Sequence, residues 1–346
     1  MLRRKGRREL LEWMSGKNLP PAELHLLRLG RPSMGSRLEV VIPARERGRV
    51  EEIQRILDEA RRLESLLSYF DPYSTVSRLN REAAAAPIPV EPEVWGLLVL
   101  AKRIWEETEG AFDPAAGTLW RCWGFHQKQG RVPEEGELRR ALAASGLDAV
   151  ELDPERRTVR FLRPGIELNF GAIGKGYVLD CLRTLLQNAG FSAFLVHAGY
   201  SSVLARGEPA AHTGGWTVGL RNPEEPNHDV GRLRLRDVAM ATSGSGEQHF
   251  VAEGRRIGHV LDPRTGWPVE RHLAVTVLAS GAAEADALST AFFVMEAEVV
   301  RKFVKKRADL GVILVEKGAS PATPEVEVLG EARRYWGERT LSSTEV

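Results

Sequence analysis

The sequence predicts an α+β fold, in which helices and strands occur in mixed runs. Apolar residues recur every three or four positions over residues 50–67 and 92–109, as they do along the buried face of an amphipathic helix. Short apolar runs bounded by glycine, proline or aspartate are typical of strands. The two kinds of segment do not alternate regularly, which disfavours a doubly wound parallel sheet.

The order of the elements follows from these patterns and from the turn formers between them. The polar stretch 68–77 ends the first helix, Pro164 and Gly165 separate two short strands, and a glycine-rich turn precedes a later helix. The predicted helices are residues 50–67, 92–109, 137–144, about 176–188, 282–295 and 299–308. The predicted strands are residues 37–42, 158–162, 166–170, 193–196, 216–220, 233–235, 238–242, 274–279 and 311–316.

Composition excludes several classes of protein. The chain has 346 residues, and an apolar fraction of 43% supports a substantial core rather than a mainly disordered chain. Its 48 Lys and Arg residues nearly balance 47 Asp and Glu, and a net charge of +1 argues against a dedicated nucleic-acid-binding protein. Two cysteines, Cys122 and Cys181, make neither a disulfide framework nor a thiolate metal site. No run approaches the roughly 20 apolar residues that span a bilayer.

The amino end resembles the start of an export signal without its apolar part. Residues 2–8 are basic, but Glu9, Glu12 and Lys17 interrupt the apolar residues that should follow. As written, the chain is therefore expected to be cytoplasmic, whereas a truncated start would make it exported or membrane-anchored.

One motif, Gly171-Ala-Ile-Gly174-Lys175-Gly176, lies between a predicted strand and a predicted helix. Its glycines allow a ligand to approach the backbone, and the amino end of a helix favours anions. Lys175 adds a positive charge. The pattern lacks the spacing of a Walker loop, and tight packing of the turn is the alternative reading.

A second motif places Asp286 and Thr290 four residues apart, on one face of a predicted helix. A carboxylate and a hydroxyl are oxygen ligands that Mg²⁺ accepts while it keeps water and phosphate in its other positions. The alternative is an aspartate that interacts with the helix dipole and a threonine bonded within its own helix.

Two further motifs are aspartate-proline turns. The first is His259-Val-Leu-Asp262-Pro-Arg-Thr265-Gly, preceded in sequence by Thr242-Ser243-Gly; the second is Asp113-Pro-Ala-Ala-Gly. Proline presets one backbone dihedral and glycine permits a positive one, so each forms a rigid turn. Most such turns are structural, and the histidine three residues before Asp262 is what suggests a site.

The order of these motifs resembles the ApbE family, the FAD:protein FMN transferases, over about residues 33–316. The most specific blocks are His-x-x-Asp-Pro-x-Thr-Gly at 259–266 and Ala-Asp-Ala-x-x-Thr at 285–290. The resemblance implies a duplicated, tunnelling-fold-like α+β architecture with FAD bound in a cleft between two halves. The domain is then residues 33–333, with an amino-terminal extension over 1–32 and a polar tail over 334–346.

The resemblance also implies the reaction and its ligands. Family members use Mg²⁺ to cleave the FAD pyrophosphate, transfer FMN to a Thr or Ser hydroxyl of a partner protein and release AMP. Asp286, Thr290 and the main-chain carbonyl of Gly174 match the magnesium ligands. The acceptor is expected to be another protein with a Thr/Ser flavinylation motif, a membrane-associated redox protein among the candidates, because this chain lacks the motif.

The remaining site residues are implied in the same way. His259, Asp262 and Lys175 match catalytic positions, and either His259 or Asp262 would be the base for the incoming hydroxyl. The residues that match flavin-binding positions are Met34, Phe70, Asp113, Gly171, Lys175, Thr242, Ser243, His259 and Thr265.

Some residues depart from the family pattern. Phe70 stands where tyrosine is common, Asn169 replaces an aspartate before the glycine turn, and Tyr200 replaces a glycine. These departures leave two alternatives to transfer: a Mg²⁺-dependent FAD pyrophosphatase that yields FMN and AMP, and a non-catalytic FAD-binding protein.

Overall fold

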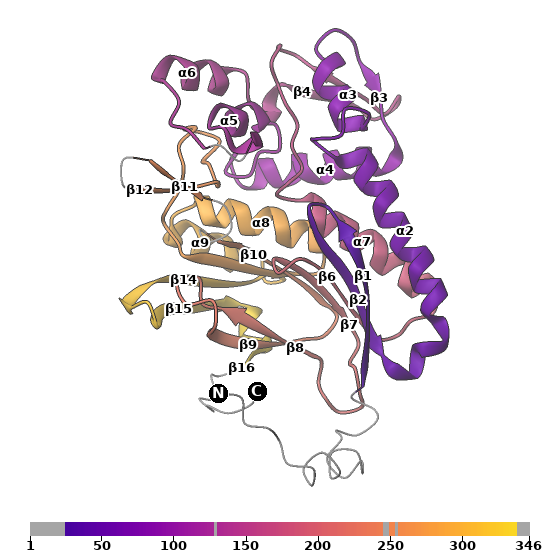
Figure 1. Ribbon diagram of the computed structural model, residues 1–346. Coiled ribbons are helices and arrows are strands. Elements are labelled where there is room, and N and C mark those ends of the chain that lie inside the picture. The colour runs from indigo at the N-terminus through magenta and orange to yellow at the C-terminus, as the bar shows by residue number, and fades with distance from the viewer. Residues whose placement is uncertain (1–24, 128–129, 245–248, 253–254, 338–346) are drawn as a thin grey trace, which may run out of the picture.

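The computed structural model describes residues 25–127, 130–244, 249–252 and 255–337, and its class is mixed helix and sheet, as predicted (Figure 1). The basic segment 2–8 and most of the predicted polar tail lie outside the described residues. The helices are α2 (Val50–Leu67), α3 (Thr75–Glu82), α4 (Pro92–Glu107), α5 (Gly117–Cys122), α6 (Glu135–Ala143), α7 (Gly174–Asn188), α8 (Ala282–Val294), α9 (Ala297–Lys306) and α10 (Ala332–Tyr335).

The main sheet has eight strands, and every neighbouring pair is antiparallel. In spatial order they are β1 (Leu26–Ser33), β2 (Ser36–Pro43), β6 (Phe194–Ala198), β7 (Ser202–Arg206), β10 (Val238–Gly244), β13 (Ala274–Ala279), β14 (Gly311–Ser320) and β15 (Thr323–Gly330). Three smaller sheets contain β3 (Ile88–Pro89), β5 (Thr158–Phe161) and β4 (Val150–Asp153); β16 (Trp336–Gly337), β9 (Asp229–Leu235) and β8 (Trp216–Arg221); and β11 (His249–Ala252) with β12 (Arg255–Gly258).

The central strands of the main sheet are buried on both faces, which gives this part of the molecule three layers. Side chains of successive strand residues point to opposite faces, so Val40 and Ile42 join the large core under the helices while Val41 joins a second core. The second core lies against β8, β9 and β16, and includes Trp216 and Leu233. Figure 1 shows α7, α8 and α9 on one side of the sheet and the small three-stranded sheet on the other.

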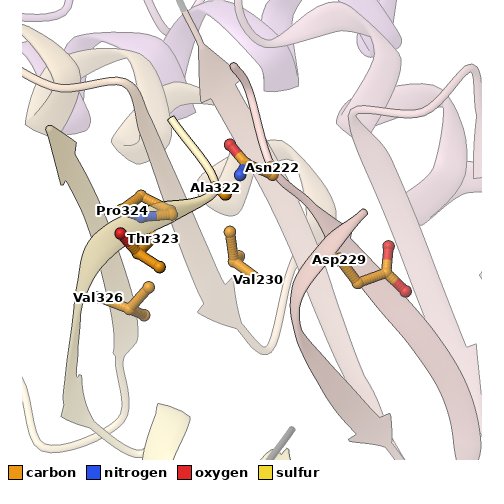
Figure 2. Close-up of a pocket in the computed structure, with 7 residues that line it drawn as sticks. All are labelled: Asn222, Asp229, Val230, Ala322, Thr323, Pro324 and Val326. Atoms are coloured by element: carbon orange, nitrogen blue, oxygen red, sulfur yellow. The ribbon is translucent and has the colours of Figure 1, made fainter. Parts of the chain in front are cut away.

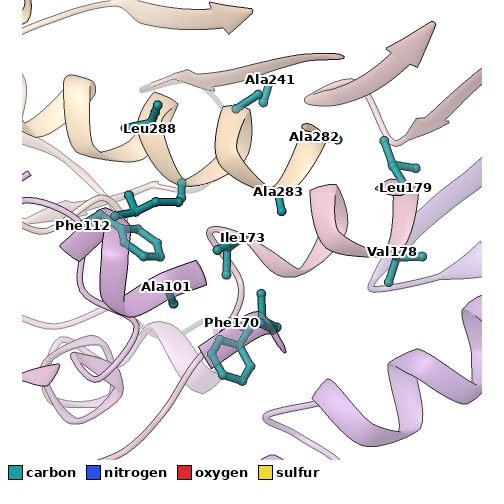
Figure 3. Close-up of a cluster of buried hydrophobic side chains, with 14 of the residues drawn as sticks. Ala101, Phe112, Phe170, Ile173, Val178, Leu179, Ala241, Ala282, Ala283 and Leu288 are labelled. Atoms are coloured by element: carbon teal, nitrogen blue, oxygen red, sulfur yellow. The ribbon is translucent and has the colours of Figure 1, made fainter. Parts of the chain in front are cut away.

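A mainly helical segment lies above α7 and α8 and contains α3 to α6 with β3 to β5 (Figure 1). Apolar side chains of α3 and α4 enter the same core as those of α7 and α8, whereas Leu119 of α5 and Leu138 of α6 form a separate small cluster. Figure 3 shows this junction, where Phe112 and Ala101 approach Ile173 and Leu288. The segment therefore packs directly against the two helices that carry the glycine and aspartate motifs.

One predicted pair of strands is wrong. Residues 166–170 do not pair with 158–162; β5 pairs instead with β4 and β3. The β4–β5 turn is held by Asp153, whose Oδ1 accepts from the Glu155 and Arg156 amides at 2.9 and 3.1 Å. The backbone of residues 166–170 binds other partners, since the side chain of Asn80 exchanges two hydrogen bonds with Leu168.

The other predicted helices and strands are present with small changes at their ends. The elements that were missed include α3, β1, β15 and the central strand β7. Helix α7 begins at Gly174 rather than near 176, and β1 begins at Leu26, inside the predicted extension. Strand β1 pairs with β2 through the turn at Met34 and Gly35, both of which have positive φ, as a two-residue hairpin of type I′ requires. Among the described helices, none combines the length and apolar character needed to cross a membrane.

The helix layer should depend on Leu57, whose side chain is 1% exposed in the core under α2. Leu57→Ala should lower the free energy of unfolding by about 2–5 kcal/mol, because it removes buried apolar surface and leaves a cavity. Arg55→Ala, on the exposed face of the same helix, should have little effect. Urea denaturation of the three proteins measures the difference, and equal stabilities would contradict the assigned core.

Candidate active site

The amino ends of α7 and α8 are in direct contact at Gly176. Its amide donates a 2.6 Å hydrogen bond to Oδ2 of Asp286. A Cβ at this position would lie 2.1 Å from the carbonyl oxygen of Ala282, so only glycine lets the two backbones approach this closely. The tight-packing reading of the glycine motif is therefore correct for Gly176, and the same contact places Lys175 beside Asp286.

Asp286 is a buried carboxylate with partners on both oxygens. Besides the Gly176 amide, the Ser202 hydroxyl donates to Oδ1 at 2.7 Å. Burial raises the pKa of Asp286 above its ordinary value, while Lys175, Ser202 and the Gly176 amide act in the opposite direction. The ammonium of Lys175 donates to Ser201 Oγ at 2.5 Å. A carboxylate oxygen can accept more than one bond, so Asp286 retains capacity for a further ligand.

Hydroxyl groups surround the next turn of α8. Ser243 Oγ lies 2.8 Å from Ser289 Oγ and 3.2 Å from Thr290 Oγ1. Thr290 also donates to the Asp286 carbonyl at 3.4 Å, the within-helix bond that the alternative reading predicted. The end of β10 thus meets the face of α8 that carries Asp286 and Thr290.

Thr242 and Met34 connect this group to neighbouring segments. The Thr242 amide donates to the carbonyl of Ser201 at 2.8 Å, and its hydroxyl lies 2.8 Å from that of Thr276. Gly174 is buried at the start of α7, where a Cβ would lie 3.2 Å from Met34 Cε. We call the set Met34, Gly174, Lys175, Thr242, Ser243, Asp286 and Thr290 the helix-start group.

The helix-start group offers oxygen ligands of the kind that a magnesium ion accepts. Within the described residues there is no group of three or more His, Cys, Asp or Glu side chains placed to hold a metal. Mg²⁺ is commonly held by one or two carboxylates, with water and substrate phosphate completing the site. The single carboxylate, hydroxyls and main-chain oxygens present here fit that pattern.

The turn at Asp262 does not belong to the helix-start group and packs near the end of α5 instead. Arg264 binds both carboxylate oxygens of Asp262, from Nε and Nη2, at 2.9 Å each. The Gly266 amide donates to the Asp262 carbonyl at 2.7 Å, and the Trp123 indole donates to the Gly266 carbonyl at 2.8 Å. This part of the His259 motif is a rigid turn anchored on α5, as its proline and glycine predict. His259 is half-buried beside it, and Thr265 is exposed.

Asp113 connects three parts of the helical segment by hydrogen bonds. Its carboxylate accepts from the Ala115 amide at 2.7 Å and from the Leu147 amide and the Trp105 indole at 3.1 Å each. Burial raises its pKa from 3.8 to about 6, although these three donors favour the charged form. The structure places its carboxylate against these internal donors.

Phe70 and Gly171 are accessible from solvent. Phe70 is 68% exposed and meets Trp120 edge to face, with ring centroids 6.1 Å apart. The Gly171 amide binds the side chain of Asn169 at 2.9 Å. Tyr200 is also exposed, and the Arg221 guanidinium lies 4.2 Å from its ring centroid.

Two surface pockets share no residue with these groups. One lies between β9 and β15 and is lined in part by Asn222, Val230 and Val326 (Figure 2). The other is lined by residues of α7, β7 and the β9–β10 turn, including Arg183 and Asp237. Neither pocket contains a predicted site residue.

Sequence reasoning missed two residues that hold the helix-start group. Ser202 binds Asp286, but nothing in the sequence distinguishes it from other strand serines. Asp180 binds the first amides of α8. Its spacing of four residues from Gly176 was a usable signal, because it places the two residues on one face of α7.

Comparisons with known proteins identify the family of the chain. The family model described as the ApbE family matches residues 34–314. The chain is 32% identical over 268 residues to an FAD:protein FMN transferase from Klebsiella pneumoniae, covering 76% of this chain and 81% of that protein. The structure matches that of an ApbE protein from Thermotoga maritima with a TM-score of 0.82 and 29% identity, covering 91% of this chain and 100% of the other. The structure also matches that of a flavinyl transferase from Pseudomonas stutzeri, with a TM-score of 0.76 and 26% identity. This match covers 91% of this chain and 98% of the other.

The raised pKa of Asp113 predicts a pH dependence of stability. The folded chain holds this proton up to about pH 6, whereas the unfolded chain loses it near 3.8. The folded state therefore binds more protons between these values, and its stability falls as pH rises through this range, by about 3 kcal/mol in total.

Asp113→Asn cannot titrate and serves as the reference. The measured quantity is the difference in the free energy of unfolding, wild type minus Asp113→Asn. This difference should decrease between about pH 4 and pH 6 and then level off. Urea denaturation across this range measures the difference, and a constant value would contradict the raised pKa.

Proposed function

The chain belongs to the ApbE family, and from this premise we propose that it is an FAD:protein FMN transferase. The acceptor hydroxyl, on a Thr or Ser of a partner protein, attacks the phosphorus on the FMN side of the FAD pyrophosphate. The bond from that phosphorus to the bridging oxygen breaks and AMP leaves with this oxygen. The observation that carries the proposal is the buried Asp286 between Gly176 and Ser202, next to Lys175.

Asp286, Thr290 and the carbonyl of Gly174 would hold Mg²⁺ in this proposal. When bound, this ion neutralises the pyrophosphate and stabilises the charge that develops in transfer. Ser202 and the Gly176 amide keep the Asp286 carboxylate in one orientation. Lys175 supplies a fixed positive charge beside it, which favours an anionic substrate.

His259 is the better candidate for the base. Both carboxylate oxygens of Asp262 accept from Arg264, so protonating Asp262 would weaken a two-bond ion pair. His259 is half-buried in the segment that leads into this anchored turn. We assign proton removal to His259 and the orientation of its segment to Asp262.

The flavin would lie between the helix-start group and the exposed aromatic residues, in a cleft between two duplicated halves. Phe70 offers a face on which a flavin ring can stack, and Trp120 supports it from the side. Met34 and Gly171 lie near the start of α7, Thr242 and Ser243 at the end of β10, and Thr265 within the Asp262 turn. We assign Asp113 an indirect role, in shaping the loop after α4.

The reaction is tested by its products. The protein is incubated with FAD and Mg²⁺, with and without a membrane-associated redox protein that carries a Thr/Ser flavinylation motif. Transfer predicts AMP together with a mass increase of the acceptor equal to FMN. Asp286→Ala should reduce AMP release by at least about 10³-fold, because the ion loses its only carboxylate ligand.

Asp58→Ala is the matched control, since Asp58 is an exposed aspartate on α2 and should retain activity. AMP with free FMN would identify an FAD pyrophosphatase instead, and unchanged bound FAD a binding protein. AMP release that survives Asp286→Ala would exclude the proposed metal site.

His259→Gln tests the assignment of the base. Transfer to the acceptor should slow by about 10²–10⁴-fold, because general-base catalysis is lost, while FAD binding measured by flavin fluorescence persists. His228→Gln, at an exposed histidine, is the control. A His259→Gln protein with the wild-type transfer rate would exclude His259 as the base.

A further inference from the structure

Helices α7 and α8 each begin without a side-chain cap of their own. The residues before them, Ile173 and Gly281, make no side-chain bond to the first amides. The first turn of a helix leaves amide groups that need acceptors from elsewhere. In this structure the Gly174 amide donates to the carbonyl of Phe170, and each helix also supplies a carboxylate acceptor to the first turn of the other.

Asp180, in the second turn of α7, binds the first two amides of α8. Its Oδ1 accepts from Ala282 at 3.0 Å and its Oδ2 from Ala283 at 2.9 Å. A carboxylate is favoured at this position by the positive end of the helix dipole. Arg183 lies 3.1 Å from the same carboxylate and fixes it from the other side.

Asp286, one turn into α8, makes the reverse contact with the Gly176 amide at 2.6 Å. Gly176 and Asp180 are four residues apart on α7, and Ala282 and Asp286 are four residues apart on α8. Residues at this spacing share one helix face. The hydrogen bonds of Asp180 and of Asp286 therefore connect the same two helix faces in opposite directions. The missing side chain of Gly176 allows the backbones to close between them.

The other side of the first turn of α8 is held differently. Glu284 forms ion pairs with Arg103 of α4 and Arg307 beyond α9, at 3.0 and 3.1 Å. These pairs fix the turn against the outer helices. Its distance from α7 is set by the contacts of Asp180 and Asp286.

We propose that Asp180 is a positioning residue, which keeps the first turn of α8 against α7 and thereby holds Asp286 at the amide of Gly176 and at the metal. The part of this inference that concerns the metal rests on the proposed function. The effect of Asp180 on the position of Asp286 does not depend on that function. Residues that orient a metal ligand from outside are worth about 10- to 100-fold in metal affinity.

Asp180→Asn tests the proposal in the full-length protein. Asparagine has one acceptor oxygen, and its amide group would face a backbone amide donor. One of the hydrogen bonds from Ala282 and Ala283 is therefore lost. The Gly176 amide should then exchange its hydrogen faster in nuclear magnetic resonance experiments. Mn²⁺ binding, followed by electron paramagnetic resonance, should weaken by about tenfold, while FAD binding without metal is unchanged.

Asp153→Asn is the matched control. Asp153 also accepts from two backbone amides, those of Glu155 and Arg156, but it lies in the β4–β5 turn. Both amides bind the same oxygen of Asp153, which asparagine keeps, so this variant should change neither the exchange at Gly176 nor the Mn²⁺ affinity. If Asp180→Asn does not fold, Asp180→Glu takes its place, because the added methylene displaces the carboxylate from Ala282 and Ala283.

The outcomes separate the two proposals. Wild-type exchange at Gly176 and wild-type Mn²⁺ affinity in the Asp180 variant would overturn the positioning role. A wild-type protein that binds no Mn²⁺ would overturn the proposed metal site, and exchange at Gly176 would still decide whether Asp180 positions Asp286.

Discussion

The contact between the amino ends of α7 and α8 at Gly176 is the constraint on which the site depends. Any side chain at this position would overlap the backbone of Ala282. The close approach brings the Asp286 carboxylate to an amide it can accept from and places Lys175 beside it. A single missing Cβ therefore determines where the acidic, basic and hydroxyl groups meet.

The doubly covered sheet gives this contact a rigid base. Strands β7, β10 and β13 are central in the main sheet, with apolar layers on both faces. Ser202 extends from β7 and Ser243 from the end of β10, so both hydroxyls are delivered by backbone that has little freedom. Groups on central strands are held more precisely than groups on loops.

A buried charge at this site is destabilising by itself but is stabilised by the partners around it. A buried carboxylate is unfavourable unless it is paired or hydrogen-bonded. Asp286 meets that cost with two donors and a nearby ammonium, whereas Asp262 meets it with both bonds of one guanidinium. The first arrangement leaves room for a further positive ligand, and the second uses the carboxylate to build a turn. The same residue type thus serves two roles, and its neighbours determine which.

The sequence by itself determined the fold class, the longer helices and about half of the described strands, and it singled out Gly174, Lys175, Asp286 and Thr290 at the start of α7 and α8 but not Asp180 or Ser202. Periodicity located α2 with its correct ends, and the pairing of Asp286 with Thr290 followed from helical spacing. The family resemblance, based on the motif order, is confirmed by the match over residues 34–314.

Only the tertiary structure decided which residues face one another across the chain. Asp180 and Ala282 are 102 residues apart, and Ser202 and Asp286 are 84 apart, so no local pattern could join them. Residues 166–170 read as a strand because they are apolar, yet their backbone binds Asn80 and the loop before α5. Local sequence sets the preference of a segment, but the partners of its polar groups depend on long-range packing, which a linear pattern does not contain.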